Sequence, residues 1–271
     1  MSDSLGAWSN APLVYALAEV RTERLADIKN YQAKFAGRLR DGGYPIQRIL
    51  QSTKLVATGA NVIFEPEPDA GVWEFATPDN KTAVMLRVNG IVLHATHYID
   101  SKTFLARLQN MIEVFAEEVP SVYVNRVGLR YVDFVLPRKA ETPEKYIHPQ
   151  LNPDLGLGKQ PGGITATNLA IYPMNGDRRL AVRYTRGRGK PEMPPDLRVL
   201  SLEPSPLMKL DIKDDQPTAI LDFDCSITYS PVDRIDVDRL KKDFAAIYED
   251  SYAAFLAAIT PHARRVWGEK K

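Results

Sequence analysis

The chain of 271 residues is 44% hydrophobic and 25% charged, with a formal net charge of +1. These proportions are ordinary for a folded globular protein, and the small net charge excludes a general electrostatic attraction to nucleic acid or to an anionic membrane. The single cysteine, Cys225, excludes an internal disulfide and a zinc site built from several cysteines.

The sequence predicts a cytoplasmic protein with no membrane partner. Residues 1–10 are polar and lack the basic and apolar stretches of a secretory signal. No apolar run approaches the roughly 20 residues that cross a bilayer. The lack of disulfides fits a reducing compartment.

The first predicted element is a strand buried on both faces. Residues Leu13–Val20 form an almost unbroken apolar run without helical spacing, which is typical of such a strand. A helix is the alternative, because the run contains alanines. A helix capped by Asp27 follows. Its apolar residues share one face: Ile28, Tyr31, Phe35 and Leu39.

The middle of the chain predicts strands and then a long helix. Strands are expected near residues 48–57, 62–65 and 72–76, and a hairpin over Thr82–Tyr98 turns at Asn89-Gly90, where both residues tolerate positive φ. The helix Ser101–Val119 follows, and Pro120 ends it. Its apolar stripe consists of Phe104, Leu105, Leu108, Met111, Ile112, Phe115 and Val119.

The C-terminal part alternates regular and irregular segments. A long strand is expected at Val122–Leu136, and an irregular region at 137–163 has a short helical insertion around Pro143–Ile147. Further strands are expected at Ile164–Tyr172 and Leu180–Tyr184, before a second irregular region at 186–216. The cleanest alternation lies at Thr218–Tyr229 and precedes a helix over Ile235–Thr260.

A hairpin followed by a long helix thus occurs twice. We predict an α+β fold of two related halves, 1–120 and 121–271, each with antiparallel strands followed by a long amphipathic helix, in one compact unit. A duplicated sheet-plus-helix unit would explain the pattern, although residue identity between the halves is negligible. The insertions at 137–163 and 186–216 belong to the second half.

Four charged residues on two strands are candidates for a binding site or polar cavity. Arg126 and Arg130 project from one face of their strand, and Asp222 and Asp224 project from one face of theirs. In an antiparallel sheet they can form a charged surface or a partly buried network. Paired carboxylates also serve acid–base chemistry. A structural role and a functional one both stay open.

A basic segment at 183–190 is a candidate for phosphate or nucleic-acid contacts. Its cations are Arg183, Arg186, Arg188 and Lys190, with Tyr184 among them. This composition suits phosphate contacts combined with stacking on bases, and a solvated loop is the alternative. Gly156-Leu157-Gly158-Lys159 and Gly187-Arg188-Gly189-Lys190 look like phosphate loops but lack the complete Walker spacing.

The sequence predicts no metal site and no cofactor. His94 and His97 stand three apart on a strand and therefore face opposite sides. Cys225 lies on the apolar face of its strand, where burial raises the pKa of a thiol and makes it a poor nucleophile. The common serine-nucleophile signatures are missing, so an enzyme class is not indicated.

Several short motifs are spread over most of the chain. They are Asn10-Ala11-Pro12-Leu13-Val14, Glu19-Val20-Arg21, Trp73-Glu74-Phe75, Tyr98, Arg126-Val127-Gly128-Leu129-Arg130-Tyr131, and Phe255 with Ile259-Thr260. Together they resemble a sporadically distributed bacterial family of uncharacterised proteins of about this length. The resemblance implies an accessory role, such as defence, toxin–antitoxin control or partnership with a neighbouring gene product, and it implies no catalytic residues.

These observations leave three functional hypotheses. The first is a non-enzymatic binding or regulatory protein that recognises a protein or a small ligand. The second is a nucleic-acid-binding protein that uses residues 183–190. The third is an enzyme of unknown class with a polar cavity around Arg126, Arg130, Asp222 and Asp224. No heptad seam is present, so the sequence leaves the oligomeric state open.

Overall fold

The computed structural model describes residues 8–25, 28–58, 61–119, 121–152, 165–197 and 201–268. The strands in this part of the chain are β1 Leu13–Thr22, β2 Ile46–Thr58, β3 Asn61–Ala76, β4 Thr82–Arg87, β5 Gly90–Ala95, β6 Tyr123–Val135, β7 Ala166–Pro173, β8 Arg178–Arg188 and β9 Pro217–Arg234. The α-helices are α1 Ile28–Asp41, α2 Ser101–Glu118, α3 Val237–Ala258 and α4 Pro261–Trp267.

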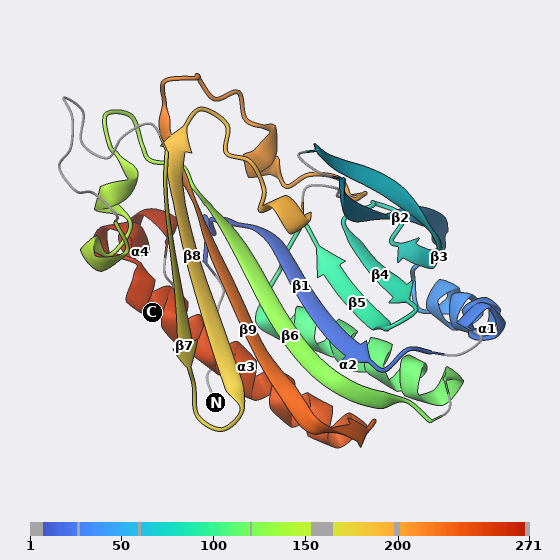
Figure 1. The fold of residues 1–271 in the computed structure, drawn as a ribbon. Coiled ribbons are helices and arrows are strands. Elements are labelled where there is room, and N and C mark those ends of the chain that lie inside the picture. Colours follow the sequence, from blue (N-terminus) through green and yellow to red (C-terminus); the bar gives the residue numbers. More distant parts are fainter. Residues whose placement is uncertain are drawn as a thin grey trace.

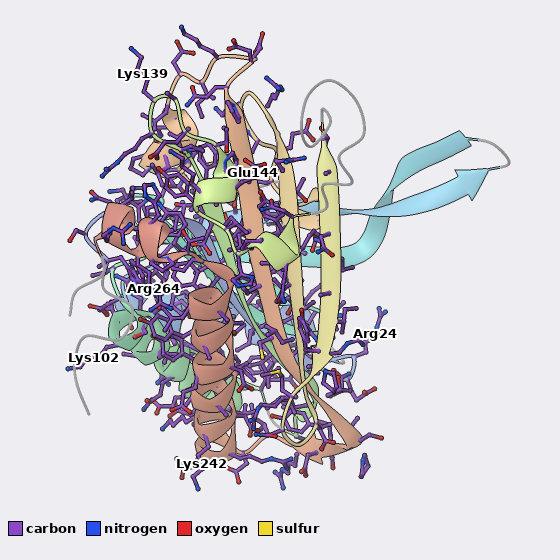
Figure 2. The ribbon with its side chains drawn as sticks, turned by 90° about the vertical axis from the view of Figure 1, so that its left-hand side faces the viewer. Arg24, Lys102, Lys139, Glu144, Lys242 and Arg264 are labelled. Carbon is purple, nitrogen blue, oxygen red and sulfur yellow. The ribbon has the colours of Figure 1, made fainter. Side chains whose placement is uncertain are left out.

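All nine of these strands form one antiparallel sheet in the order β2-β3-β4-β5-β1-β6-β9-β8-β7 (Figure 1). Figure 2 shows α2 and α3 on one side of this sheet, and the β2–β3 hairpin projecting away from the other strands. The main apolar core lies between the sheet and the helices. We call the opposite side of the sheet the open face.

The predicted division into two sheet-plus-helix halves is wrong. The strands β1 and β6 come from opposite sides of the expected boundary at residue 120, yet they pair along their length, from Leu13–Asp133 to Thr22–Val124. The sheet therefore runs without a break across that boundary. The hairpin-and-helix pattern that occurs twice in the sequence shows which residues share a face, but it does not show which strands pair.

The individual elements follow the sequence patterns closely. The apolar run at 13–20 is a strand, as predicted, and both of its faces are buried. The Asp100 carboxylate accepts a hydrogen bond of 2.6 Å from the Thr103 amide and so caps α2. The apolar stripe of α2 faces the core, with Phe104, Leu108 and Phe115 buried. The predicted cap Asp27 lies outside the described residues.

Several strands are longer than predicted. The separate strands expected near 62–65 and 72–76 form the single strand β3. The strand β8 continues to Arg188, beyond its expected end at Tyr184. In the first insertion, a 3₁₀ turn at Pro143–Lys145 matches the predicted short helix, and residues 153–163 lie outside the described part of the chain.

The second insertion covers part of the open face. Its described residues include 3₁₀ turns at Pro195–Leu197 and Pro206–Lys209. Leu197 and Ile212 pack with Val132 of β6 in a second apolar cluster on the side of the sheet away from the helices. The sheet is thus buried on both sides near the C-terminal end of β6.

Among the described residues, no helix is long and apolar enough to span a bilayer.

Phe35 joins α1 to the rest of the core. Its side chain is fully buried, and its ring centroid lies 5.9 Å from that of Phe75 and 6.3 Å from that of Phe115. We expect Phe35→Ala to lower the free energy of unfolding by about 3–5 kcal/mol, because it removes these contacts and leaves a cavity. Ile49→Ala, at a side chain that is 70% exposed, is the control. Urea unfolding measures both, and equal effects would contradict this packing.

Candidate functional site

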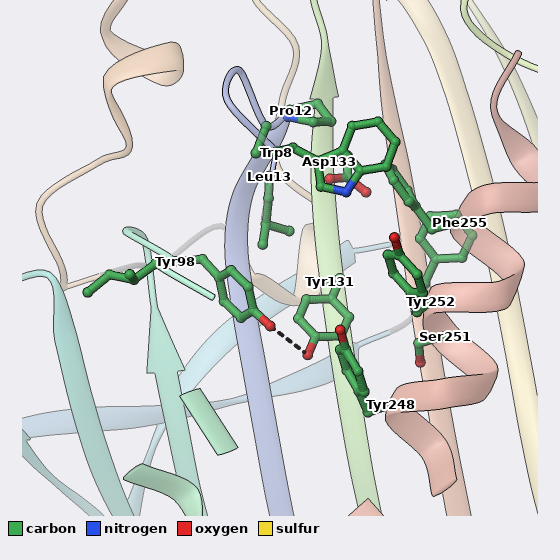
Figure 3. A pocket seen from close by; sticks show the side chains of 13 residues that line it. Trp8, Pro12, Leu13, Tyr98, Tyr131, Asp133, Tyr248, Ser251, Tyr252 and Phe255 are labelled. Atoms are coloured by element: carbon green, nitrogen blue, oxygen red, sulfur yellow. Dashed lines mark hydrogen bonds between the residues drawn. The ribbon is translucent and has the colours of Figure 1, made fainter. Parts of the chain in front are cut away.

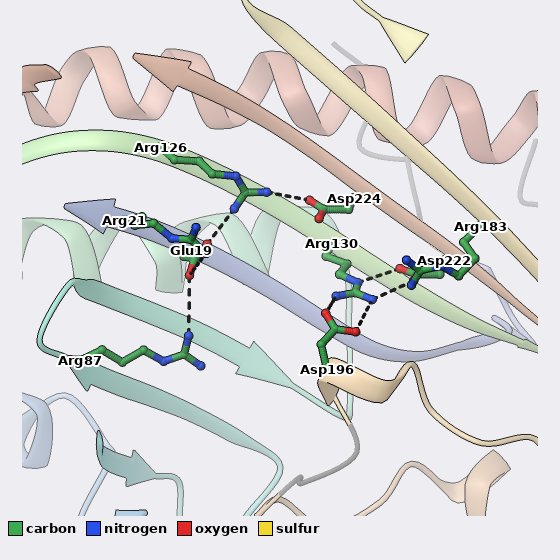
Figure 4. A network of polar contacts seen from close by, with 9 residues as sticks. All are labelled: Glu19, Arg21, Arg87, Arg126, Arg130, Arg183, Asp196, Asp222 and Asp224. Carbon is green, nitrogen blue, oxygen red and sulfur yellow. Dashed lines mark hydrogen bonds and ion pairs between the residues drawn. The ribbon is translucent and has the colours of Figure 1, made fainter. Parts of the chain in front are cut away.

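The four charged residues selected from the sequence lie together on the open face (Figure 4). The register between β6 and β9 places Arg130 opposite Asp224 and Val132 opposite Asp222. Because alternate residues of a strand share a face, Arg126 and Arg130 point to the same side as the two aspartates. The structure therefore brings these four residues together, in two neighbouring groups of ion pairs.

Arg130 is the centre of the first group. Its Nε and Nη2 atoms each donate a hydrogen bond of 2.8 Å to Asp222, and its guanidinium also binds both carboxylate oxygens of Asp196. Arg183 donates to Asp222 as well, at 3.2 Å. Asp196 belongs to the 3₁₀ turn Pro195–Leu197, so Arg130 ties the second insertion to the sheet.

Arg126 is the centre of the second group. Its guanidinium donates to Glu19 at 2.7 Å and to Asp224 at 3.2 Å. A Cβ atom on Gly128 would lie 2.8 Å from Nη1 of Arg126, so the missing side chain of Gly128 leaves room for the guanidinium to cross the strand. Burial raises the pKa of Asp224, and the nearby Arg126 partly opposes this shift.

Each carboxylate of these two groups already has a guanidinium partner, so the arrangement stabilises the open face. Neither pocket described for this molecule is lined by any of the four selected residues. Within the described ranges, no group of three or more His, Cys, Asp or Glu side chains is able to hold a metal ion. The four selected residues therefore form ion pairs with their neighbours and leave no unpaired carboxylate among the two groups.

The residues of the basic segment are divided between both sides of the sheet. Arg183 pairs with Asp222 on the open face. Arg186 is buried and pairs with Glu144. Arg188 donates to the carbonyl of Asp215 at 3.2 Å, and Lys190 follows the end of β8. Nucleic-acid binding by this segment stays a prediction. The residues Gly156–Lys159 lie outside the described part of the chain.

The predicted core position of Cys225 is confirmed, and His94, for which the sequence left a surface or a core position open, is buried as well. The Cys225 side chain is fully buried, and burial raises the pKa of its thiol to about 12. His94 is also fully buried; its Nδ1 atom lies 3.1 Å from the Tyr15 hydroxyl, and its Nε2 atom lies 3.4 Å from Glu74. Burial lowers the pKa of His94, which keeps its ring neutral.

The sequence did not predict a pocket on the helix side of the sheet (Figure 3). Its volume is about 100 Å³, and it lies between β6, α3 and the residues that precede β1 and follow β5. Most of its wall is aromatic, with contributions from Trp8, Tyr98, Tyr131, Tyr248, Tyr252 and Phe255.

The rings that line this aromatic pocket meet mainly edge to face. The rings of Trp8 and Phe255 lie 5.5 Å apart at 87°, and those of Tyr98 and Tyr131 lie 5.7 Å apart at 90°. The hydroxyl groups of Tyr98 and Tyr131 are 3.5 Å apart. These arrangements are favourable for aromatic pairs and fix the walls of the pocket.

Asp133 supplies the ionisable carboxyl group of the pocket. The residue is 4% exposed, and the described residues give its carboxyl group neither a hydrogen bond nor an ion pair. Burial raises the pKa of Asp133 to about 8, and the negative charge of Asp222 on the other side of the sheet adds to this shift. At neutral pH the carboxyl group is therefore mostly protonated.

Sequence signals for the pocket exist, but they are scattered. Asp133 occupies a position on β6 that faces the helices, among otherwise apolar or aromatic residues. On α3, Tyr248, Tyr252 and Phe255 follow each other at helical spacing. The acidic residue Asp133 within an apolar pattern is the sequence signal from which the site was predictable.

No protein-family model matches this chain, and no curated protein matches it. The family resemblance suggested by the short motifs therefore stays a prediction.

Arg130 should matter more for stability than Arg126. In Arg130→Ala the buried Asp222 loses its main partner, and removing one member of a buried pair costs about 3–5 kcal/mol. The matched control Arg126→Ala breaks ion pairs that are more exposed, which are worth about 1 kcal/mol or less. Urea unfolding compares the two variants. Similar losses in both would show that Arg130 is not the main anchor.

The raised pKa of Asp133 predicts how the stability of the ligand-free protein depends on pH. The folded state keeps a proton that the unfolded state releases above a pH of about 4. Stability from this group is therefore full below that pH and falls by about 1.4 kcal/mol per pH unit up to the folded pKa. We expect Asp133→Asn to gain stability relative to the native protein as the pH rises from 5 to 8. A constant difference in urea unfolding over this range would contradict the raised pKa.

Proposed function

We propose that this protein is a non-enzymatic binding protein that holds a small organic ligand in the aromatic pocket. The observation that carries the proposal is the buried Asp133 carboxyl group, which lines an apolar pocket and finds no hydrogen-bond or ion-pair partner among the described residues. Pockets for small molecules combine largely apolar walls with a few polar groups that fix the orientation of the ligand. A buried polar group without a partner is costly for the protein, and a ligand removes that cost.

The size of the pocket restricts the ligand. An engineered cavity of about 150 Å³ binds benzene, so a pocket of about 100 Å³ suits a compact molecule with few heavy atoms. Nucleotides and peptides are too large to enter it whole.

The charged residues of the open face support this proposal because their side chains are already paired with one another. Arg126 and Arg130 are held by carboxylates from other elements, and the contacts explain how the second insertion stays in place. An enzyme built on these residues stays a hypothesis without a specific observation in its favour. The cytoplasmic location and the accessory role also stay predictions, which rest on the sequence alone.

The proposal predicts that filling the pocket prevents binding. Ala11 lines the pocket at an exposed position, so Ala11→Phe adds a ring there without replacing a buried side chain. We expect it to weaken binding at least tenfold. The control is Ala253→Phe, at an exposed position of α3 that does not line the pocket. Saturation-transfer NMR with phenol, choline and 3,3-dimethylbutan-1-ol measures binding to each protein. The proposal fails if none of these probes binds to the native protein.

A further inference from the structure

We infer that the ligand of the aromatic pocket is a small organic cation, an alkylammonium ion that ion-pairs with the Asp133 carboxylate. This inference rests on the proposed function of the same pocket. It adds the charge of the ligand and the group that recognises it.

The charges around the pocket favour a cation over an anion. The 13 residues that line it include the acidic side chain of Asp133 but no lysine, arginine or histidine. An anion would find no positive side chain there and would be repelled by an ionised Asp133. A cation supplies the partner that the carboxylate lacks among the described residues, and a buried charge is tolerated only when it is paired.

The aromatic walls favour the same charge. The faces of Trp and Tyr rings carry a partial negative charge, and cages of such rings bind quaternary ammonium groups. The nearly perpendicular pairs Trp8–Phe255 and Tyr98–Tyr131 place rings around more than one side of the pocket (Figure 3). The cation is therefore attracted by the rings as well as by Asp133.

The far end of the pocket is suited to a polar substituent. The hydroxyl groups of Tyr98 and Tyr131 lie close together there, while the hydroxyl of Ser251, which also lines the pocket, is buried and donates to the Ile247 carbonyl. A compact ammonium ion with a short polar arm matches this arrangement of a carboxylate, aromatic walls and hydroxyl groups. Choline has this shape and serves as a probe.

Binding of a cation should depend on pH through Asp133. The other titratable groups that line the pocket are the tyrosines Tyr98, Tyr131, Tyr248 and Tyr252, and Asp222 acts on Asp133 from across the sheet. Burial raises the pKa of Tyr98, Tyr131 and Tyr248, so these phenols stay neutral near pH 8. Asp133 must release its proton to pair with the cation. The affinity should then rise about tenfold per pH unit below a pH of about 8 and level off above it.

The decisive experiment compares choline with 3,3-dimethylbutan-1-ol, which has the same shape but no charge. Calorimetric titration measures the binding of both compounds to the native protein from pH 6 to pH 9. At pH 9, choline should bind at least tenfold more tightly than the alcohol. Choline binding should weaken toward pH 6, and alcohol binding should not change. Asp133→Asn should weaken choline binding at least tenfold and make it independent of pH, with the alcohol unaffected.

The possible results separate the two proposals. If the alcohol binds as tightly as choline at pH 9, or if choline binding does not change with pH, the ligand does not ion-pair with Asp133 and this inference fails, although the pocket still binds small molecules. If neither binds, the proposed function fails as well. The comparison on the native protein decides the charge of the ligand even if Asp133→Asn does not fold. Tyr252→Leu, which keeps an apolar wall, should weaken choline binding more than alcohol binding.

Discussion

The register of β6 between β1 and β9 is the constraint on which both sites depend. One face of β6 carries Arg126 and Arg130, and the other carries Tyr131 and Asp133. A shift of one residue would exchange the two faces along the whole strand. Arg130 would then lie under the helices without Asp222 and Asp196, which would leave a buried charge without partners. The ion pairs on the open face therefore also fix the direction of the Asp133 carboxyl group on the opposite face.

The second insertion adds to this constraint from outside the sheet. It is held by Arg130 through Asp196 and by apolar contacts of Leu197 and Ile212. These contacts cover the open face beside Val132, the neighbour of Asp133 on β6, while Asp133 itself lines the pocket on the helix side. The end of β6 is therefore held from both sides of the sheet.

Much of the local structure was predictable because side-chain periodicity encodes which face of an element is buried. The alternation in β9 placed Cys225 in the core and Asp222 on the opposite face, and the structure confirms both positions. Periodicity does not encode which strands are neighbours, and so the continuous sheet through β1 and β6 was missed. The pocket was missed for a related reason, because its walls come from segments as distant in sequence as Trp8 and Phe255.

The backbone contacts that hold Trp8 link the pocket to the C-terminal helix. The amides of Ser9 and Asn10 donate to the carbonyls of Gly268 and Trp267, at 3.3 and 2.9 Å. Trp8 therefore forms a wall of the pocket only while the end of α4 is docked. By thermodynamic linkage, a ligand that needs this wall also favours the docked helix by the same free energy. Occupancy of the pocket would then slow hydrogen exchange at the amides of Ser9 and Asn10.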